Sequence, residues 1–281
     1  MVEFMNQQIQ KSIDDAARVL ESAEAMMIGA GAGMGVDSGL PDFRGNEGFW
    51  RAYPAFRGKR FSEVSNPAWF GKDPQVAWGF FGHRYNLYSS TEPHAGFRIL
   101  SELAGRMSSP PAIFTSNVDG QFQKAGFNSC PIVECHGSIH HLQCSLRCHD
   151  KIWPAKELDL KVNADIRLES ELPTCGVCSA VARPNILMFG DYSWLPCRTE
   201  AQERNYQDWI QENASRRVAV IEIGAGMAIP TVRMECESAN GSLIRINPRD
   251  SDVGEDGIAI PLGALEALSK IKSKLDGDLN A

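Results

Sequence analysis

The sequence lacks the features that would send a chain into or across a membrane. No run approaches the roughly 18 consecutive apolar residues that a membrane-spanning helix needs. The first residues, MVEFMNQQIQKSIDD, carry acidic groups early and lack the basic-then-apolar pattern of a secretory signal. We therefore expect a cytoplasmic protein without a membrane partner.

An excess of basic residues is also missing. The chain has 28 Lys and Arg residues against 35 Asp and Glu residues, a net charge of -7 and a pI near 5.4. This balance gives no electrostatic basis for binding nucleic acid or anionic lipid, so we expect neither as a partner. An acidic surface suits a basic partner instead, such as a lysine-bearing peptide.

No internal repeat or low-complexity tract is present, and the 281 residues are 43% hydrophobic, which suits one large α/β domain with a smaller appendage. Short apolar runs typical of buried parallel strands alternate with helical patterns, so we predict a Rossmann-like, doubly wound parallel sheet. The predicted strands are 25–28, 112–115, 132–134, 185–189, 218–223, 243–246 and 257–260, and the predicted helices are 7–23, 94–104, 200–212 and 264–275.

Two stretches do not fit this alternation. Residues 46–92 hold three of the six Trp residues and predict a helical insertion, whereas residues 139–183 hold paired cysteines and predict a small zinc-binding module. We assign both to a small domain. The Rossmann-like domain would then consist of residues 1–45, 93–138 and 184–281.

Four glycines at alternate positions, Gly29, Gly31, Gly33 and Gly35, follow the first predicted strand. Glycine lets backbone N–H groups approach a phosphate closely. The spacing is not the G-x-G-x-x-G fingerprint of dinucleotide-binding loops, so the glycines alone leave a nucleotide loop and a tight structural turn as alternatives.

The residues that follow these glycines are more specific. The segments are GAGMGVDSGLPDFRG (31–45), TSNVDGQFQKAG (115–126), ECHGS (134–138), RPNILMFGD (183–191), IGAGMAIP (223–230) and INP (246–248). In this order they resemble the NAD-binding signature of bacterial-type sirtuins and span nearly the whole chain. The resemblance implies an NAD-consuming protein lysine deacylase with a zinc-bearing lobe.

The resemblance also implies site residues. The cofactor would be bound by Gly31, Ala32, Gly33, Asp42, Phe43, Arg44, Ser116, Asn117, Asp119, Gly224, Ala225, Gly226 and Asn247. Phe43 would cover the nicotinamide end, Asn117 and Asp119 would take part in catalysis, and Asn247 would serve the adenosine half. Taken singly, each of these residues also has an ordinary structural interpretation, such as core for Phe43 or a turn for Asn117.

The chain departs from the family pattern at several cofactor positions. Ser116 stands where Gln is usual, Ala225 and Gly226 stand where Thr and Ser are frequent, and Gly35 replaces a frequent Ser. Side-chain hydrogen bonds to ribose and phosphate are thereby lost. We expect NAD binding to be retained but weakened.

His136 follows a short apolar strand, and the resemblance assigns it the role of catalytic base. A neutral imidazole has a pKa suited to accepting a proton near pH 7. In the implied route, the acyl-lysine oxygen attacks C1′ of the nicotinamide ribose and nicotinamide leaves. The histidine then helps a ribose hydroxyl attack the resulting imidate carbon, and water releases the lysine. The products would be free lysine and O-acyl-ADP-ribose.

The chain has eight cysteines, and four of them form the pairs Cys144/Cys148 and Cys175/Cys178. In a reducing compartment such pairs are typical of metal ligands, and four thiolates close a tetrahedral Zn²⁺ site that leaves no open position for catalysis. The alternative is a redox-active dithiol.

On the substrate side, Phe189, Gly190 and Asp191 resemble a loop to which an acyl-lysine peptide adds as an extended strand. Phe81 and Arg84 stand three apart, where sirtuins that remove acidic acyl groups such as succinyl carry Tyr and Arg. Arg84 would then pair with an acyl carboxylate. The alternative is that Phe81 is core and Arg84 a solvated charge.

Three function classes therefore remain. A lysine deacylase is the leading one, with deacetylation or desuccinylation as its forms. The second is a sirtuin-type protein ADP-ribosyltransferase or NAD glycohydrolase, and the third is a non-catalytic sensor of NAD or ADP-ribose.

Overall fold

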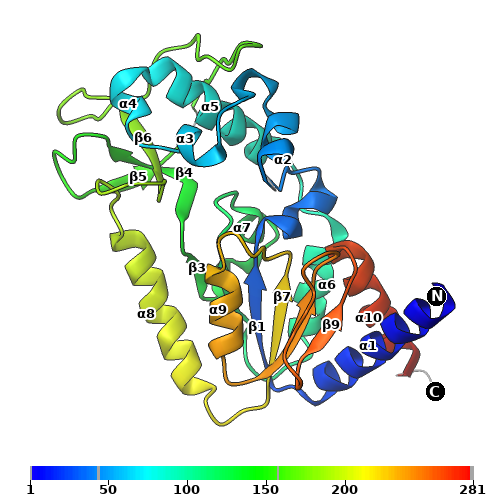
Figure 1. Ribbon diagram of the computed structural model, residues 1–281. Helices are drawn as coiled ribbons and strands as arrows, with labels where there is room; N and C mark the ends of the chain where they lie inside the picture. The colour runs from blue at the N-terminus through cyan, green and yellow to red at the C-terminus, as the bar shows by residue number, and fades with distance from the viewer. Residues whose placement is uncertain (1, 43–44, 157, 279–281) are drawn as a thin grey trace.

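A computed structural model describes residues 2–42, 45–156 and 158–278, and the side chains from residue 6 onward. Its larger part is a parallel sheet of six strands in the order β3-β2-β1-β7-β8-β9 (Figure 1). The strands are β1 (Ala25–Ala30), β2 (Ala112–Thr115), β3 (Ile132–Glu134), β7 (Val218–Ile223), β8 (Ser242–Ile246) and β9 (Ile258–Ile260).

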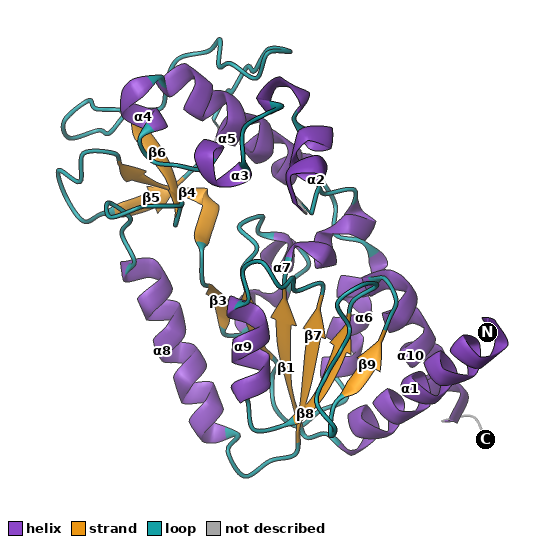
Figure 2. Ribbon diagram, in the orientation of Figure 1, coloured by secondary structure: helices purple, strands orange, loops and turns teal. Residues whose placement is uncertain are grey.

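Helices cover both faces of this sheet (Figure 2). On one face lie α1 (Val2–Ser22), α6 (Ala95–Ala104) and α10 (Ala264–Asp278), and on the other lie α8 (Cys197–Glu212) and α9 (Thr231–Ser238). Because side chains alternate along a strand, Met26 and Ile28 of β1 enter the first core, while Met27 enters the second. The short helices η1 (Ala32–Ser38), α7 (Gln121–Lys124) and η3 (Phe127–Ser129) follow strand ends.

The smaller part combines helices with a second sheet. The helices are α2 (Gly45–Ala52), η2 (Pro54–Phe56), α3 (Phe61–Val64), α4 (Trp69–Lys72) and α5 (Pro74–Ser90). The sheet is antiparallel in the order β5-β4-β6, with β4 (Gly137–Cys144), β5 (Ile152–Pro154) and β6 (Ala182–Ile186).

The helices and the small sheet share one hydrophobic core. Its aromatic residues from α2 and α5, including Phe49 and Phe80, pack with Ile139, Leu142 and Ile186 of the small sheet. Trp78 Nε1 donates to the carbonyl of Ala182 at 2.8 Å and joins α5 to β6. The two stretches that broke the sequence alternation therefore form one lobe, and the cleft lies between this lobe and the parallel sheet.

The predicted fold class is confirmed, and one predicted strand is wrong. Residues 185–189 were expected in the parallel sheet, but the strand is 182–186 and pairs antiparallel with β4. Its polar residues Arg183 and Asn185 are fully buried because they bond to Asp191 and Gln143. Apolar runs do not reveal such a strand. No helix in the described part of the chain combines the length and apolar character needed to cross a membrane.

Candidate active site and metal site

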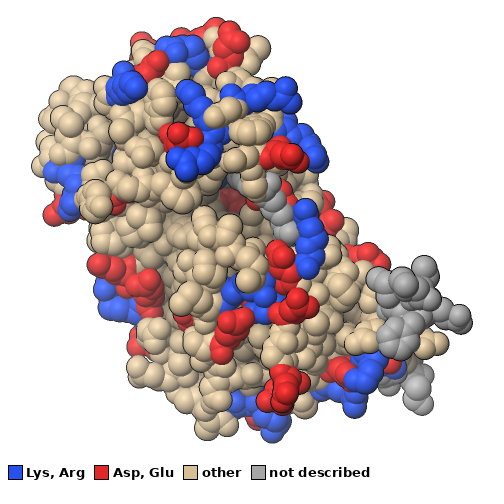
Figure 3. Space-filling model, viewed as in Figure 1, with Lys and Arg blue, Asp and Glu red and all other residues tan. Residues whose placement is uncertain are grey.

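A cavity of about 420 Å³ lies at the carboxyl ends of β1, β2 and β7, beneath the small lobe. Ligands of parallel α/β sheets bind at this end of the strands, and the volume lies in the range of small-molecule sites. Figure 3 shows acidic and basic side chains interspersed over one face of the molecule, with a hollow between its upper and lower parts.

Two glycine loops interlock at the floor of this cavity. A Cβ on Gly31 would stand 2.6 Å from Ala225 Cα, and a Cβ on Gly33 would stand 2.6 Å from Gly224 Cα. The N–H groups of Gly31 and Gly33 donate to the carbonyls of Ile223 and Gly224 at 2.9 and 3.0 Å. Gly31, Gly33 and Gly224 line the cavity and also allow the two loops to pack closely. The N–H groups of Gly31 and Gly33 bond to the other loop, which corrects the expectation that these two groups face a phosphate.

Other members of the two loops face the cavity. Ala32, Asp42, Ala225 and Gly226 contribute to its wall. Asn247 does not, because it is fully buried and its Nδ2 donates to the carbonyl of Ala225 at 2.9 Å. Asn247 thus holds the second loop from behind. Phe43 and Arg44, predicted to cover the cofactor, lie outside the described residues.

Ser116, Asn117 and Asp119 follow β2 and line the cavity. Asn117 Nδ2 donates to the carbonyl of Gly31 at 3.0 Å, which orients the amide oxygen. Burial raises the pKa of Asp119 to about 6, and the nearby charge of Glu134 adds to this, while a hydrogen bond from Gln121 N–H and the charge of Arg84 oppose it. A carboxyl group with such a pKa exchanges protons close to neutral pH.

His136 lies between β3 and β4 and lines the same cavity as the glycine loops. Its carbonyl accepts the N–H of Leu187 at 2.9 Å, which ties it to the segment after β6. Burial lowers the pKa of His136 below its usual value, and a backbone hydrogen bond with Ser116 opposes this only in part. The imidazole is therefore neutral at pH 7 and able to accept a proton.

Arg84 lines the cavity, but Phe81 does not. Phe81 is 1% exposed and packs against Phe70 and Phe80, so its predicted place in an acyl pocket is wrong. The aromatic residue beside Arg84 in the cavity is Tyr88, whose hydroxyl accepts from Arg84 Nε at 3.0 Å. Residues three and four apart on a helix share a face, and the guanidinium contacts both rings, at 5.8 Å from the Phe81 centroid and 5.3 Å from the Tyr88 centroid. Of these two rings only Tyr88 lines the cavity.

The predicted substrate loop is divided between two roles. Phe189 lines the cavity, is 38% exposed and stacks edge-on against Phe61. Gly190 has a positive φ of 65° that turns the chain away. Asp191 is predicted as a substrate-binding residue, but its side chain is buried in an ion pair with Arg183 and accepts from Ser193, so it bonds within the chain. Its role is to hold the loop.

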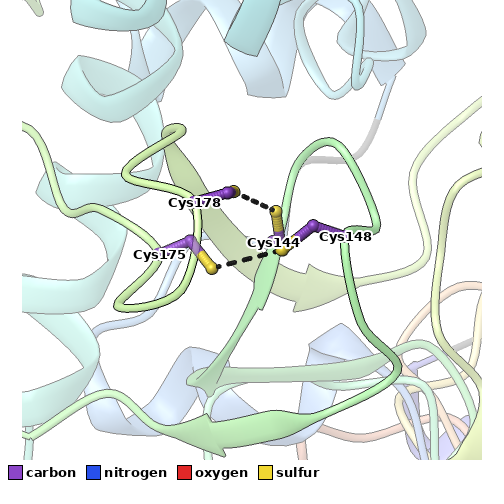
Figure 4. Close-up of side chains that lie close together, drawn as sticks. All are labelled: Cys144, Cys148, Cys175 and Cys178. Carbon is purple, nitrogen blue, oxygen red and sulfur yellow. Dashed lines mark hydrogen bonds between the residues drawn. The ribbon is translucent and has the colours of Figure 1, made fainter.

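The four paired cysteines converge in the small lobe (Figure 4). The sulfur atoms of Cys144 and Cys178 are 3.6 Å apart, as are those of Cys148 and Cys175. A tetrahedral zinc with Zn–S bonds of about 2.3 Å requires S···S separations of about 3.8 Å, so the four thiols fit a closed structural Zn²⁺ site. Cys130, Cys135, Cys197 and Cys236 lie outside this cluster.

Comparison with known proteins agrees with this arrangement. The family model described as the Sir2 family matches residues 31–214, which is more than half of the chain. The chain belongs to the Sir2 family.

Relatives of this Sir2 chain carry consistent names. An "NAD-dependent protein deacylase" of Thermococcus kodakarensis is 31% identical over 85% of the chain and 85% of the relative. Another of Thermococcus sibiricus is 28% identical over 86% and 87%. A solved structure on the structural basis for the mechanism and regulation of Sir2 enzymes has a TM-score of 0.69 and 26% identity, covering 95% of this chain and 99% of that one.

Sequence reasoning missed much of the apolar wall of the Sir2 cavity. The wall includes Leu40, Val118, Ile186, Met188, Ile229 and Val232. These residues come from four separate segments of the chain and have no shared spacing. Tyr88 could have been predicted as a cavity residue, because it stands one helical turn after Arg84 and therefore lies on the same helix face.

Proposed function

We propose that the protein is an NAD-dependent protein lysine deacylase that releases nicotinamide and O-acyl-ADP-ribose. The names of the relatives and the family membership support this activity. The observation that carries the proposal is that His136, Asn117 and Asp119 share one cavity with the two glycine loops. A base and a dinucleotide-sized space are thereby brought together.

Bound NAD would supply the ribose carbon that accepts the acyl oxygen as nicotinamide departs. Ala32, Ala225 and Gly226 would hold its phosphates through the backbone, since these positions offer no hydroxyl side chain. The amide of Asn117, fixed by Gly31, would orient the nicotinamide ribose. Neutral His136 would then take a proton from a ribose hydroxyl as that oxygen attacks the acyl carbon.

Water must be kept from the reacting ribose until the acyl oxygen arrives. The cavity wall formed by Leu40, Val118, Ile186 and Met188 is apolar and largely buried, and it supports this exclusion. An acyl-lysine would enter beside Phe189, where the chain after β6 is tied to Ser65 through Phe189 N–H at 3.0 Å. We propose acyl-lysine proteins or peptides as the partners.

An acidic acyl group is the second candidate substrate, and Arg84 favours it. Arg84 is 6% exposed as a residue and lines the cavity beside Tyr88. A charge so placed would pair with a succinyl carboxylate. Asp119 lies near enough to offset part of this charge, which favours the neutral acetyl group instead.

One experiment tests the proposal and its alternatives. The protein is incubated with NAD, with and without acetyl-lysine or succinyl-lysine peptides, and the products are identified by mass spectrometry. We expect nicotinamide release only with peptide, together with O-acyl-ADP-ribose. Release without peptide would identify an NAD glycohydrolase, a mass gain on protein an ADP-ribosyltransferase, and no release a sensor.

The His136→Ala variant should lose turnover by a factor of at least about 10² while keeping its thermal unfolding curve. His83→Gln is the matched control, because His83 bonds to Tyr53 at 3.0 Å and does not line the cavity. Normal turnover by His136→Ala would overturn the assignment of the base.

A further inference from the structure

Strand β3 is at one edge of the parallel sheet, and helix α8 covers its outer side. An edge strand has backbone groups that its sheet does not pair. At Glu134, the last residue of β3, side chains of α8 supply the hydrogen-bond partners for these backbone groups. The N–H of Glu134 donates to Gln202 Oε1 at 3.1 Å, and its carbonyl accepts from Thr199 Oγ1 at 3.1 Å.

The side chain of Glu134 is bound by the same helix. Its Oε2 pairs with Arg198 Nη2 and accepts from Gln202 Nε2 at 3.3 Å. The Glu134 side chain is 2% exposed and that of Arg198 is 20% exposed, so the carboxylate depends on the helix for its partners. Among described residues, Glu134 Oε1 and Arg198 Nη1 are buried atoms without a hydrogen bond.

This contact stands between two parts of the proposed site. Glu134 is two residues before His136, and Arg198 is the second residue of α8, the helix that follows the substrate loop at 189–191. The first turns of α8 therefore fix the end of β3, which His136 follows, and they also fix the chain that leaves the substrate loop at 189–191. Neither Glu134 nor Arg198 lines the cavity.

We propose that Arg198 and Glu134 form a positioning pair for the active site. Together with Thr199 and Gln202, the pair fixes the strand end that aims His136 into the cavity. It also sets the electrostatic potential at Asp119, because Arg198 offsets the buried negative charge of Glu134. The effect of the pair on catalysis rests on the proposed function, whereas its effect on the electrostatic potential at Asp119 does not.

Several charged or titratable groups act on Asp119. Arg84 and Tyr88 approach it from α5, and His140 approaches it from β4, where Nε2 contacts the carbonyl of Asp119 at 2.9 Å. Glu134 approaches it from β3, where it is the register partner of Thr115, four residues before Asp119. Among these groups only Glu134 bonds to Arg198. The charges of Arg198 and Glu134 also act on His141 of β4, whose pKa is lowered to about 4, mainly by burial. A change at Arg198 therefore reaches Asp119 through the balance of charge between Arg198 and Glu134.

The two partners should move Asp119 in opposite directions. Arg198→Met removes the positive charge, so the negative charge of Glu134 acts more strongly and the pKa of Asp119 rises. Glu134→Gln removes the negative charge and keeps the shape of the side chain, so the pKa falls. A loss of structure alone would not give opposite shifts.

The first measurement is the pH titration of the Asp119 carboxyl carbon by NMR, which needs no turnover. We expect shifts of about half a unit to one unit, upward for Arg198→Met and downward for Glu134→Gln. The double variant should return close to the parent value, and Arg198→Lys should restore it. Arg204→Met, an exposed charge removal on the same helix, is the matched control and should shift nothing.

The second measurement is kcat/KM against pH with an acyl-lysine peptide. The acidic limb should move with the NMR shifts, and Arg198→Met should lose about threefold to tenfold in kcat/KM at pH 6, through kcat more than KM. Shifts of the same sign, or no shift with Glu134→Gln, would overturn the proposal. Opposite NMR shifts in a protein without deacylase turnover would leave the pair intact and refute the proposed function instead.

Discussion

Gly33 and Gly224 exclude each other's side chains. A Cβ on Gly33 would stand 2.6 Å from Gly224 Cα, and a Cβ on Gly224 would stand 2.5 Å from Gly33 Cα. Gly224 also has a positive φ of 63°, which L side chains rarely adopt. The two loops at the cavity floor are thus one packed unit, and a change in either displaces the other.

The first prediction follows from this contact. Gly33→Ala should separate the loops, destabilise the protein by about 1–3 kcal/mol as overpacking does, and weaken ADP-ribose binding. Gly226→Ala is the control for stability, because no atom lies within 4 Å of its built Cβ. Denaturant unfolding and calorimetry measure both effects. Equal stability of the two variants would refute the interlock.

The second prediction concerns Asp119, whose pKa is raised from 3.8 to about 6. A carboxyl group with a raised pKa stabilises the fold below pH 3.8, and this contribution is lost as pH rises through 6. The stability of Asp119→Asn relative to the parent should therefore increase as pH rises through this window, by on the order of 1–3 kcal/mol at pH 7. Turnover by the variant should fall. Unfolding curves at pH 4 and pH 7 measure the difference, which should be absent at pH 4.

The third prediction concerns the metal. Elemental analysis should return about one zinc per chain, and chelation or Cys178→Ser should unfold the small lobe. Cys130→Ser is the control, since Cys130 lies outside the cluster. A folded protein that holds no zinc would contradict the assignment, and reversible disulfide formation within the cluster would support the dithiol alternative.

The fourth prediction concerns the buried pair of Arg183 and Asp191. Burial by itself would raise the pKa of Asp191, but the hydrogen bonds and charge of Arg183 prevail and hold it below its usual value. Asp191→Asn leaves Arg183 buried without its counter-charge and should cost about 3–5 kcal/mol. This loss of unfolding free energy should exceed the loss caused by Asp208→Asn, which removes an exposed carboxylate. It should diminish as pH falls through the pKa of Asp191, because Asp191 of the parent protein is then protonated and the ion pair is lost in the parent as well.

The strands of the parallel sheet could be predicted because each is a short, buried apolar run, as β7 (Val218–Ile223) is. Strand β6 could not, since burial of Arg183 and Asn185 depends on partners at Asp191 and Gln143 that only the folded chain supplies. Periodicity likewise gave no sign that 46–92 and the cysteine module share a core.

The residues of the candidate site were also predicted only in part from the sequence. The motif predicted that His136, Asn117 and Asp119 meet in one place, and they do line one cavity. The motif did not reveal that Asp191 bonds inward to Arg183 or that Phe81 points into the aromatic core, because a residue's direction depends on its neighbours in space. The glycine spacing left a nucleotide loop and a tight structural turn as alternatives, and it did not reveal that Gly31 and Gly33 pack against a second loop at Gly224 and Ala225.

Only Cys135 and His136 separate the last residue of β3 from the first residue of β4. His136 therefore lies in the two-residue connection between the large sheet and the small sheet. With so short a connection, the orientation of the imidazole depends on how the two sheets are held relative to each other.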